Sequence, residues 1–160
     1  MKILLIADTH GYNLNIERVI QRHKDEIQMV CHLGDGVLDL FALKPKFPDL
    51  KMVGVAGNAY GKEADIEELV LELPLDKKAL FIHGHQFRVK RGFESLTRYA
   101  KEKGVDACFF AHTHLPTIET RDGLFLMNPG SLGAPWGSGK TYGLVNVTDT
   151  GDISGCVERG

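Results

Sequence analysis

Seven nitrogen- or oxygen-bearing side chains occur in short clusters along the 160 residues, and their types are those of metal ligands. None is Cys, so the set suits manganese, iron, zinc or nickel rather than a structural, Cys-rich zinc. Each cluster follows a short apolar run typical of a strand, and side chains at strand ends can converge at one edge of a sheet. The candidate ligands are Asp8, His10, Asp35, Asn58, His83, His112 and His114.

Each cluster taken alone also has an ordinary structural interpretation. Asp8 and His10 are two residues apart, so an extended segment points both side chains the same way, but this spacing is also common in plain loops. Asp35 would equally well cap a helix, and Asn58 would equally well form a turn. Two His-x-His clusters in one short chain are unusual, and neutral imidazole is a good ligand for these metals. The joint pattern therefore carries the prediction of a metal site.

The other histidines receive different interpretations. In the segment His83-Gly84-His85 we take His83 as a ligand and His85 as a partner of the substrate or leaving group. His23 lies on an apolar helical stripe and is interpreted as a core or boundary histidine. His32 adjoins the candidate site, but its spacing does not demand a role there, and it is interpreted as structural.

Length and composition predict one globular domain over residues 1–160. The chain is 43% hydrophobic and 25% charged with a net charge of −2, which argues against disorder and against a strong non-specific nucleic-acid binder. No apolar run approaches the ~18 residues of a membrane span, and the N-terminal segment is typical of a first strand rather than a signal peptide. The three cysteines match no zinc or redox motif; we expect Cys31 and Cys108, which lie in apolar runs, to be buried thiols, and the protein to be cytoplasmic.

Apolar periodicity predicts alternating strands and helices in the first half of the chain. Strands are expected at residues 2–7, 28–33 and 51–56, with one helix between the first two and a short helix at 38–43. The second half is predicted to be richer in strands. It contains strands at 69–73 and 79–82, a helix at about 93–103 ended by Gly104, a strand at 106–111, and hairpins at 117–127 and 142–157. Two sheets packed face to face, with helices outside, accommodate this many strands.

Together these clusters resemble the calcineurin-like metallophosphoesterase superfamily, whose motif order is D-x-H, G-D, G-N, H and G-H-x-H. The resemblance spans essentially the whole chain. The short length, His83-Gly84-His85 and Asn128-Pro129-Gly130-Ser131 are similar to the small single-domain branch of bacterial and archaeal phosphodiesterases. The resemblance implies an α/β fold of the mixed α+β kind, a four-layer αββα sandwich in which helices flank two mixed β-sheets.

The resemblance also implies two divalent metal ions, with manganese expected first and iron, zinc, nickel or cobalt as alternatives. One ion would be held by Asp8, His10, Asp35 and His114. The other would be held by Asp35, Asn58, His83 and His112, with Asp35 bridging the two. The implied activity is that of a metallophosphoesterase in which a hydroxide bridging the ions attacks a phosphodiester, or a monoester, in line. The residues expected to take part in catalysis are His85, Asp35 and Asn58.

The chain departs from the family pattern in two places. Larger members carry His after the Gly-Asn pair, and the small branch commonly carries an acidic residue in the second of the two following positions, whereas this chain has Ala59 and Tyr60. The general acid is therefore open between His85 and, as the weaker candidate, Tyr60. Ala111 replaces a family Gly, a small-for-small change that we expect to be harmless.

Two further functions compete with hydrolysis. A non-catalytic interaction protein with this fold, like the retromer sorting subunit, is the main alternative, but a complete ligand set favours a working site. Residues 137–141 look like the end of a phosphate-binding P-loop, yet that motif needs Gly where Ala134 stands and a helix where a strand is predicted. A glycine-rich loop at the rim of the site fits better. Trp136 in this loop is expected to contact a substrate or another subunit, or to anchor the loop.

The expected partner is a small phosphate-ester substrate. We expect no stable binding of nucleic acid and no membrane association. The resemblance further implies a homo-oligomer, either a dimer or a tetramer.

Overall fold

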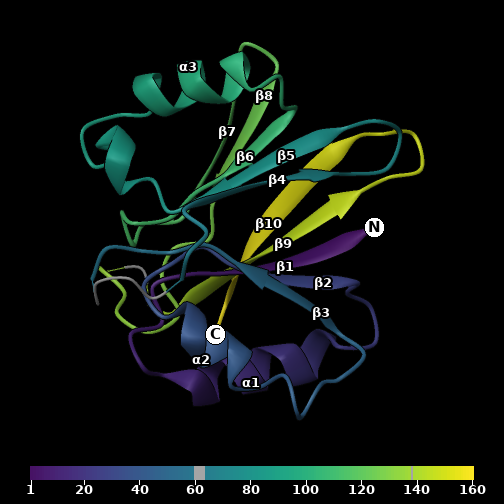
Figure 1. Cartoon of the computed structure of the whole chain (residues 1–160), viewed down its shortest axis with the longest axis vertical. Coiled ribbons are helices and arrows are strands. Elements are labelled where there is room, and N and C mark those ends of the chain that lie inside the picture. The colour runs from purple at the N-terminus through teal and green to yellow at the C-terminus, as the bar shows by residue number, and fades with distance from the viewer. Residues whose placement is uncertain (60–63, 138) are drawn as a thin grey trace.

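The chain is described here by a computed structural model that covers residues 1–59, 64–137 and 139–160. Within these residues, two five-stranded sheets pack face to face, with helices on both outer sides (Figure 1). Helices α1 (Asn13–His23) and α2 (Val37–Phe41) cover the first sheet, and α3 (Glu94–Glu102) covers the second. The predicted αββα sandwich with two mixed sheets is confirmed.

The first sheet has the strand order β10-β9-β1-β2-β3. Its strands are β1 (Lys2–Ile6), β2 (Met29–His32), β3 (Lys51–Gly54), β9 (Thr141–Val147) and β10 (Ile153–Arg159). The first three are parallel, as the alternation of strands and helices predicts, and β9 and β10 add antiparallel strands beside β1. The apolar run of β1 is buried on both faces because Ile3 and Leu5 face the second sheet while Leu4 and Ile6 face α1.

The second sheet has the strand order β4-β5-β6-β8-β7. Its strands are β4 (Glu68–Glu72), β5 (Lys78–Ile82), β6 (Ala107–Phe109), β7 (Thr117–Arg121) and β8 (Leu124–Asn128). The three central strands are parallel, and β4 and β7 are antiparallel edges. Leu96 and Ala100 of α3 pack on the outer face of this sheet against Leu80 and Ile82.

Several element ends differ from the prediction. The strands predicted at residues 28–33 and 106–111 are shorter, as β2 (Met29–His32) and β6 (Ala107–Phe109), and Tyr12 occupies the N-cap of α1. A short 3₁₀ helix, η1 (His85–Phe87), was not predicted. Lys140 leads directly into strand β9, which excludes the P-loop interpretation, although Ser138 lies outside the described residues. Of the helices within the described ranges, none combines the length and apolar character needed to cross a membrane.

The topology brings the carboxyl ends of β1, β2, β3, β5 and β6 to one edge of the sandwich. The loops that follow these strands gather at the left of Figure 1, and the turn between β4 and β5 lies at the opposite end. Backbone hydrogen bonds join these loops, among them Asp8 N to Gly34 O (3.0 Å) and Ala111 N to His83 O (3.0 Å). Side chains from distant parts of the sequence are therefore held at one place.

The centre of the inter-sheet core provides a test of this packing. The rings of Phe109 and Phe81 are fully buried, with centroids 5.0 Å apart. We expect Phe109→Ala to lower the free energy of unfolding by about 3–5 kcal/mol, because it leaves a cavity between the sheets. Urea unfolding in the presence of a chelator measures this loss without any contribution from bound metal.

The matched control is Val70→Ala on the edge strand β4, where the side chain is 40% exposed. This variant is expected to change the free energy of unfolding by less than about 0.5 kcal/mol. A Phe109→Ala loss no larger than that of the control would contradict the proposed sheet-on-sheet core.

Candidate metal centre

The loops at this edge bring the candidate ligands together in two overlapping groups. Within each group the ligand atoms all lie within 4.8 Å of one another, and Asp35 belongs to both groups. The first group is Asp8, His10, Asp35 and His114, and the second is Asp35, His83 and His112. Asn58 joins the second group because its Oδ1 lies 3.1 Å from His83 Nε2. All seven residues singled out by the sequence pattern thus lie in one cluster.

The second group places atoms that can donate electron pairs close to one another. His83 Nδ1 lies 2.8 Å from the carbonyl oxygen of Leu33, to which it donates, so a neutral His83 ring presents a lone pair at Nε2. That atom faces Asn58 Oδ1 at 3.1 Å, His112 Nδ1 at 3.2 Å and Asp35 Oδ2 at 3.5 Å. A cation at this point satisfies all four atoms, which is the arrangement of a metal site with a supporting hydrogen bond behind the histidine.

The charges around His83 also favour a cation at this position. Burial acts against a charged ring, but the hydrogen bond with Asp35 and the charges of Asp8 and Asp35 outweigh it and raise the pKa of His83. Positive charge is thus favoured at a position enclosed by protein. A metal ion placed among these ligands would supply that charge.

The first group contains a buried carboxylate whose oxygens have no hydrogen-bond partner. Asp8 is fully buried, and neither of its carboxylate oxygens accepts a hydrogen bond. Burial raises the pKa of Asp8 to about 7. His114 donates from Nδ1 to Ala134 O at 2.6 Å, and its Nε2 lies 3.4 Å from Asp8 Oδ1. An unpaired buried carboxylate is costly, and a bound cation would remove that cost.

Asp35 lies between the two groups and is held as an anion. Its Oδ1 accepts the backbone N–H groups of Asn58 (2.7 Å) and Ala59 (2.9 Å). Burial alone would raise the pKa of Asp35, but His83 and these two N–H groups bring it below its usual range. A carboxylate fixed in this way can serve two ions at once.

The backbone is left-handed at five of the seven residues. These are Asp8 (φ 51°), His10 (φ 50°), Asp35 (φ 55°), His112 (φ 69°) and His114 (φ 59°). Left-handed backbone is uncommon for residues other than Gly, and such conformations cluster at functional sites where the surrounding structure enforces them. Here each one falls just after a strand, where the chain turns sharply into a loop of the site.

A polar network that the sequence did not reveal supports the first loop. Thr9 Oγ1 donates to Asp39 Oδ2 at 2.7 Å, and the same carboxylate oxygen accepts Gly11 N–H at 2.8 Å. His32 Nε2 lies 3.0 Å from the Thr9 hydroxyl, and burial, followed by the charge of His83, lowers the pKa of His32 to about 3. His32 is thus a neutral, buried support for the loop. Asp39 lies within a helix where its residue type carries no signal of this role.

The segment Asn128–Ser131 also supports the ligands. Asn128 donates from Nδ2 to Ala111 O and to Thr113 Oγ1, both at 3.0 Å. Ser131 donates from Oγ to Asp8 O at 2.8 Å. This segment therefore fixes the loops that carry His112, His114 and Asp8, although the sequence pattern alone assigned it no contact.

The two candidates for general acid are placed differently. His85, in η1, has its ring centroid 5.5 Å from that of His83 and 6.1 Å from that of His112. Its Nδ1 is buried without a hydrogen-bond partner, and burial, followed by the charge of His83, lowers the pKa of His85. Tyr60, the weaker candidate, lies outside the described residues. His23 lies away from the cluster, where its ring contacts Tyr142 and Glu26.

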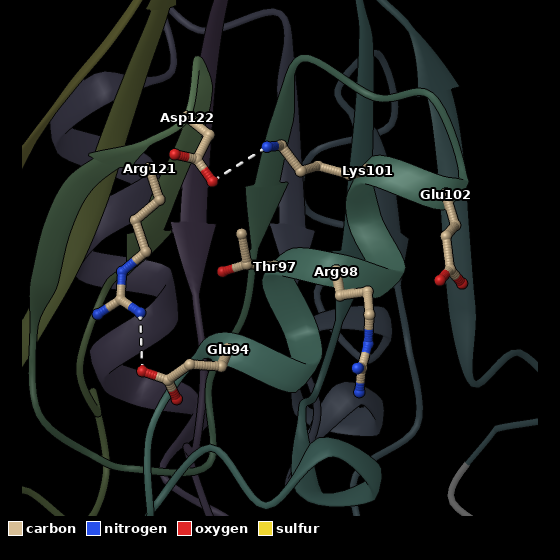
Figure 2. A pocket seen from close by; sticks show the side chains of 7 residues that line it. All are labelled: Glu94, Thr97, Arg98, Lys101, Glu102, Arg121 and Asp122. Atoms are coloured by element: carbon tan, nitrogen blue, oxygen red, sulfur yellow. Dashed lines mark hydrogen bonds and ion pairs between the residues drawn. The ribbon is translucent and has the colours of Figure 1, made fainter.

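A hollow of about 530 Å³ lies over α3, and none of the candidate ligands lines it. Figure 2 shows Lys101 directed toward Asp122 and Arg121 toward Glu94, with nitrogen–oxygen distances of 3.1 and 3.2 Å. The turn that carries Arg121 and Asp122 is at the opposite end of the β7–β8 hairpin from Asn128. These charges already pair with one another at the surface, so they offer no excess charge to a ligand.

Comparisons with known proteins agree with this geometry. The family model for the calcineurin-like phosphoesterase superfamily domain matches residues 1–150. The probable metallophosphoesterase YsnB of Bacillus subtilis is 28% identical, over 84% of this chain and 77% of its own length. Phosphodiesterase MJ0936 of Methanocaldococcus jannaschii is 29% identical, over 81% of this chain and 83% of its own length.

Solved structures share the fold. A structure described as that of a novel archaeal phosphodiesterase is 27% identical, with a TM-score of 0.74 over 99% of this chain and 100% of its own. Vps29 of Entamoeba histolytica in complex with zinc also has a TM-score of 0.74, over 99% and 98% of the two chains, at 19% identity. At that identity the Vps29 match shows the fold alone.

Gly57 provides a test of the site geometry. A Cβ atom added at this position would lie 2.0 Å from Asp35 Oδ1 and 2.2 Å from Asp35 N. We expect Gly57→Ala to displace the Asp35 carboxylate and to weaken manganese binding by about 10- to 100-fold, the scale seen when the support of a ligand is lost. Isothermal titration with manganese measures the affinity.

The control is Gly104→Ala, where an added Cβ has no atom within 4 Å but the backbone is left-handed at φ +67°. This variant is expected to lose about 1 kcal/mol of stability and to bind manganese as the unmodified chain does. Equal manganese affinity in the two variants would show that the close approach of Gly57 to Asp35 does not shape the site.

Proposed function

Because the chain belongs to the calcineurin-like phosphoesterase superfamily and is a metal-dependent phosphoesterase, we propose that it hydrolyses small phosphodiesters at the seven-residue cluster. The observation that carries the proposal is the pair of ligand groups that share Asp35. A shared carboxylate between two sets of nitrogen and oxygen donors is the arrangement expected of a dinuclear hydrolytic site. The relative MJ0936 is a phosphodiesterase, which supports diesters as the preferred substrate class.

The donor set fits two divalent ions, and we propose manganese first. Asp8, His10, Asp35 and His114 would hold one ion. Asp35, Asn58, His83 and His112 would hold the other. When bound, such ions supply Lewis acidity and a water nucleophile that is ionised near neutral pH, so no covalent enzyme intermediate is needed. Imidazole, carboxylate and amide donors without Cys suit manganese, iron, zinc, nickel or cobalt.

The protein groups set the charge and the geometry of the reaction. Only two of the seven ligands, Asp8 and Asp35, are carboxylates, so two divalent ions would retain a net positive charge toward an anionic ester. The N–H groups of Asn58 and Ala59 fix Asp35, and Leu33 O fixes the ring of His83. Preorganised charge of this kind stabilises a transition state without reorganisation during the reaction.

His85 is proposed to donate a proton to the leaving oxygen. Its ring stands beside those of His83 and His112, and its buried Nδ1 has no protein partner. A donor is needed for poor leaving groups such as alkoxides and is dispensable for good ones such as nitrophenolate.

The scaffold alternative is less well supported because both ligand groups are complete. Cys31 and Cys108 are free and buried, which supports a reducing compartment, and we propose the cytoplasm. The homo-oligomer and the absence of nucleic-acid binding stay predictions.

The central test is hydrolysis of a nitrophenyl phosphodiester by manganese-loaded protein. We expect Asp35→Asn to lower kcat/KM on the order of 10³-fold, because it removes the charge that both ions would share. Asp122→Asn, an exposed Asp-to-Asn change at the β7–β8 turn, is the matched control and should leave the activity unchanged. If the loaded protein turns over no diester, monoester or cyclic nucleotide, the scaffold alternative is preferred.

The role of His85 is tested by the choice of leaving group. We expect His85→Gln to lower kcat for alkyl phosphodiesters by about 10²-fold more than for nitrophenyl phosphodiesters, because only the former need a proton. Elemental analysis should find the same metal content in both proteins. Equal losses on the two substrates would assign His85 to substrate binding instead.

A further inference from the structure

A pocket of about 380 Å³ lies beside the metal centre. Its walls are mainly apolar and include the side chains of Val89, Lys90, Phe93, Thr113, Leu115 and Trp136. These residues come from the segment between η1 and α3, from the His112–His114 loop and from the loop before β9.

The pocket adjoins the candidate site. Thr113, one of its lining residues, lies between His112 and His114 in the chain. The ring of Trp136 meets that of His114 edge to face, with centroids 6.2 Å apart and an interplanar angle of 64°. A group bound in the pocket would therefore lie next to a group bound at the metal centre.

Packing does not explain the apolar side chains at the mouth of this pocket. Trp136 is 66% exposed and Leu115 is 48% exposed. A tryptophan that served only to anchor its loop would bury its ring, so this exposure argues against the anchor interpretation. Exposed aromatic surface beside a polar site is typical of a binding surface.

A positive charge lines the pocket. The Lys90 ammonium stands 5.8 Å from the centroid of the Trp136 ring. Because the ring of Trp136 also contacts the ring of His114, Lys90 lies near the candidate ligands. A ligand that joins an aromatic ring to an anion matches this combination.

We propose that this pocket binds the aromatic group of an aryl or nucleoside phosphodiester while its phosphate lies at the metal centre. This proposal rests on the proposed function and specifies its substrate class. Trp136 and Leu115 form the walls against which the ring packs, and Lys90 faces the phosphate. The volume is at the lower end of the range for small-molecule sites, so the pocket accepts one ring system rather than a whole ligand.

The single tryptophan of the chain makes this proposal directly testable, because intrinsic fluorescence reports on Trp136 alone. Manganese-loaded protein is titrated with methylphosphonate, phenylphosphonate and an adenosine phosphonate, whose carbon–phosphorus bonds resist hydrolysis. We expect the two aromatic ligands to change the fluorescence and to bind about tenfold more tightly than methylphosphonate. A response to phenylphosphonate alone selects aryl esters, and a response to both ligands admits nucleoside esters.

Substitutions in the pocket test whether its walls cause the preference for aromatic ligands. Leu115→Ala should reduce the preference for phenylphosphonate over methylphosphonate to within about twofold, because it removes one wall of the pocket. Leu75→Ala is the matched control, since Leu75 is 60% exposed in the β4–β5 turn at the other end of the sheet, and it should keep the full preference. Trp136→Ala, followed by competition against nitrophenyl diester hydrolysis, should also lose the preference.

The failure of this proposal differs from the failure of the proposed function. If diesters are hydrolysed but phenylphosphonate and methylphosphonate bind equally, or if Leu115→Ala and Trp136→Ala keep the preference, the pocket assignment is overturned and the hydrolytic function stands. If no ester is hydrolysed while the aromatic ligands still change the fluorescence, the hydrolytic function is overturned and the ring site stands.

Discussion

The structure depends on one electrostatic constraint: buried atoms that can donate electron pairs face one another, and positive charge between them is favoured. A neutral His83 donates its one proton from Nδ1 to Leu33 O, and its Nε2 faces Asn58, His112 and Asp35. Asp8 is enclosed by protein with both oxygens unpaired. Positive charge must enter for this arrangement to be favourable, because an isolated buried anion is far costlier than a paired one. The architecture of the two sheets serves to hold these atoms in place.

The rigidity needed for this comes from the loops as much as from the sheets. Thr9, Asp39 and Ser131 fix the first loop by hydrogen bonds to its backbone and side chains, and Asn128 fixes the loop after β6. Gly57 approaches the Asp35 carboxylate so closely that a side chain there would displace it. The ligands are therefore placed by groups that never touch a metal, which is how precise coordination is usually maintained.

Much of this could be predicted from the sequence, and the remainder has physical reasons for being hidden. The strands were predictable because apolar runs and hairpin turns are local signals, and the joint order of the polar clusters singled out side chains that the fold brings together. The contact of Asp39 with Thr9 was not predictable, because it joins a helix to a loop 30 residues away and neither residue type is distinctive. The pocket beside Trp136 is formed by three separate segments, so its volume exists only in the folded chain.

The left-handed backbone at Asp8 and Asp35 has an evolutionary consequence. Asn tolerates this conformation as readily as Asp and has nearly the same shape, so an exchange of one for the other leaves the loop undisturbed. The exchange nevertheless deletes a charge on which the bound ions depend. One codon change would thus remove most of the proposed activity and leave the outline of the protein unchanged. Proteins with this fold can therefore lose hydrolytic activity by such an exchange and still keep their backbone structure.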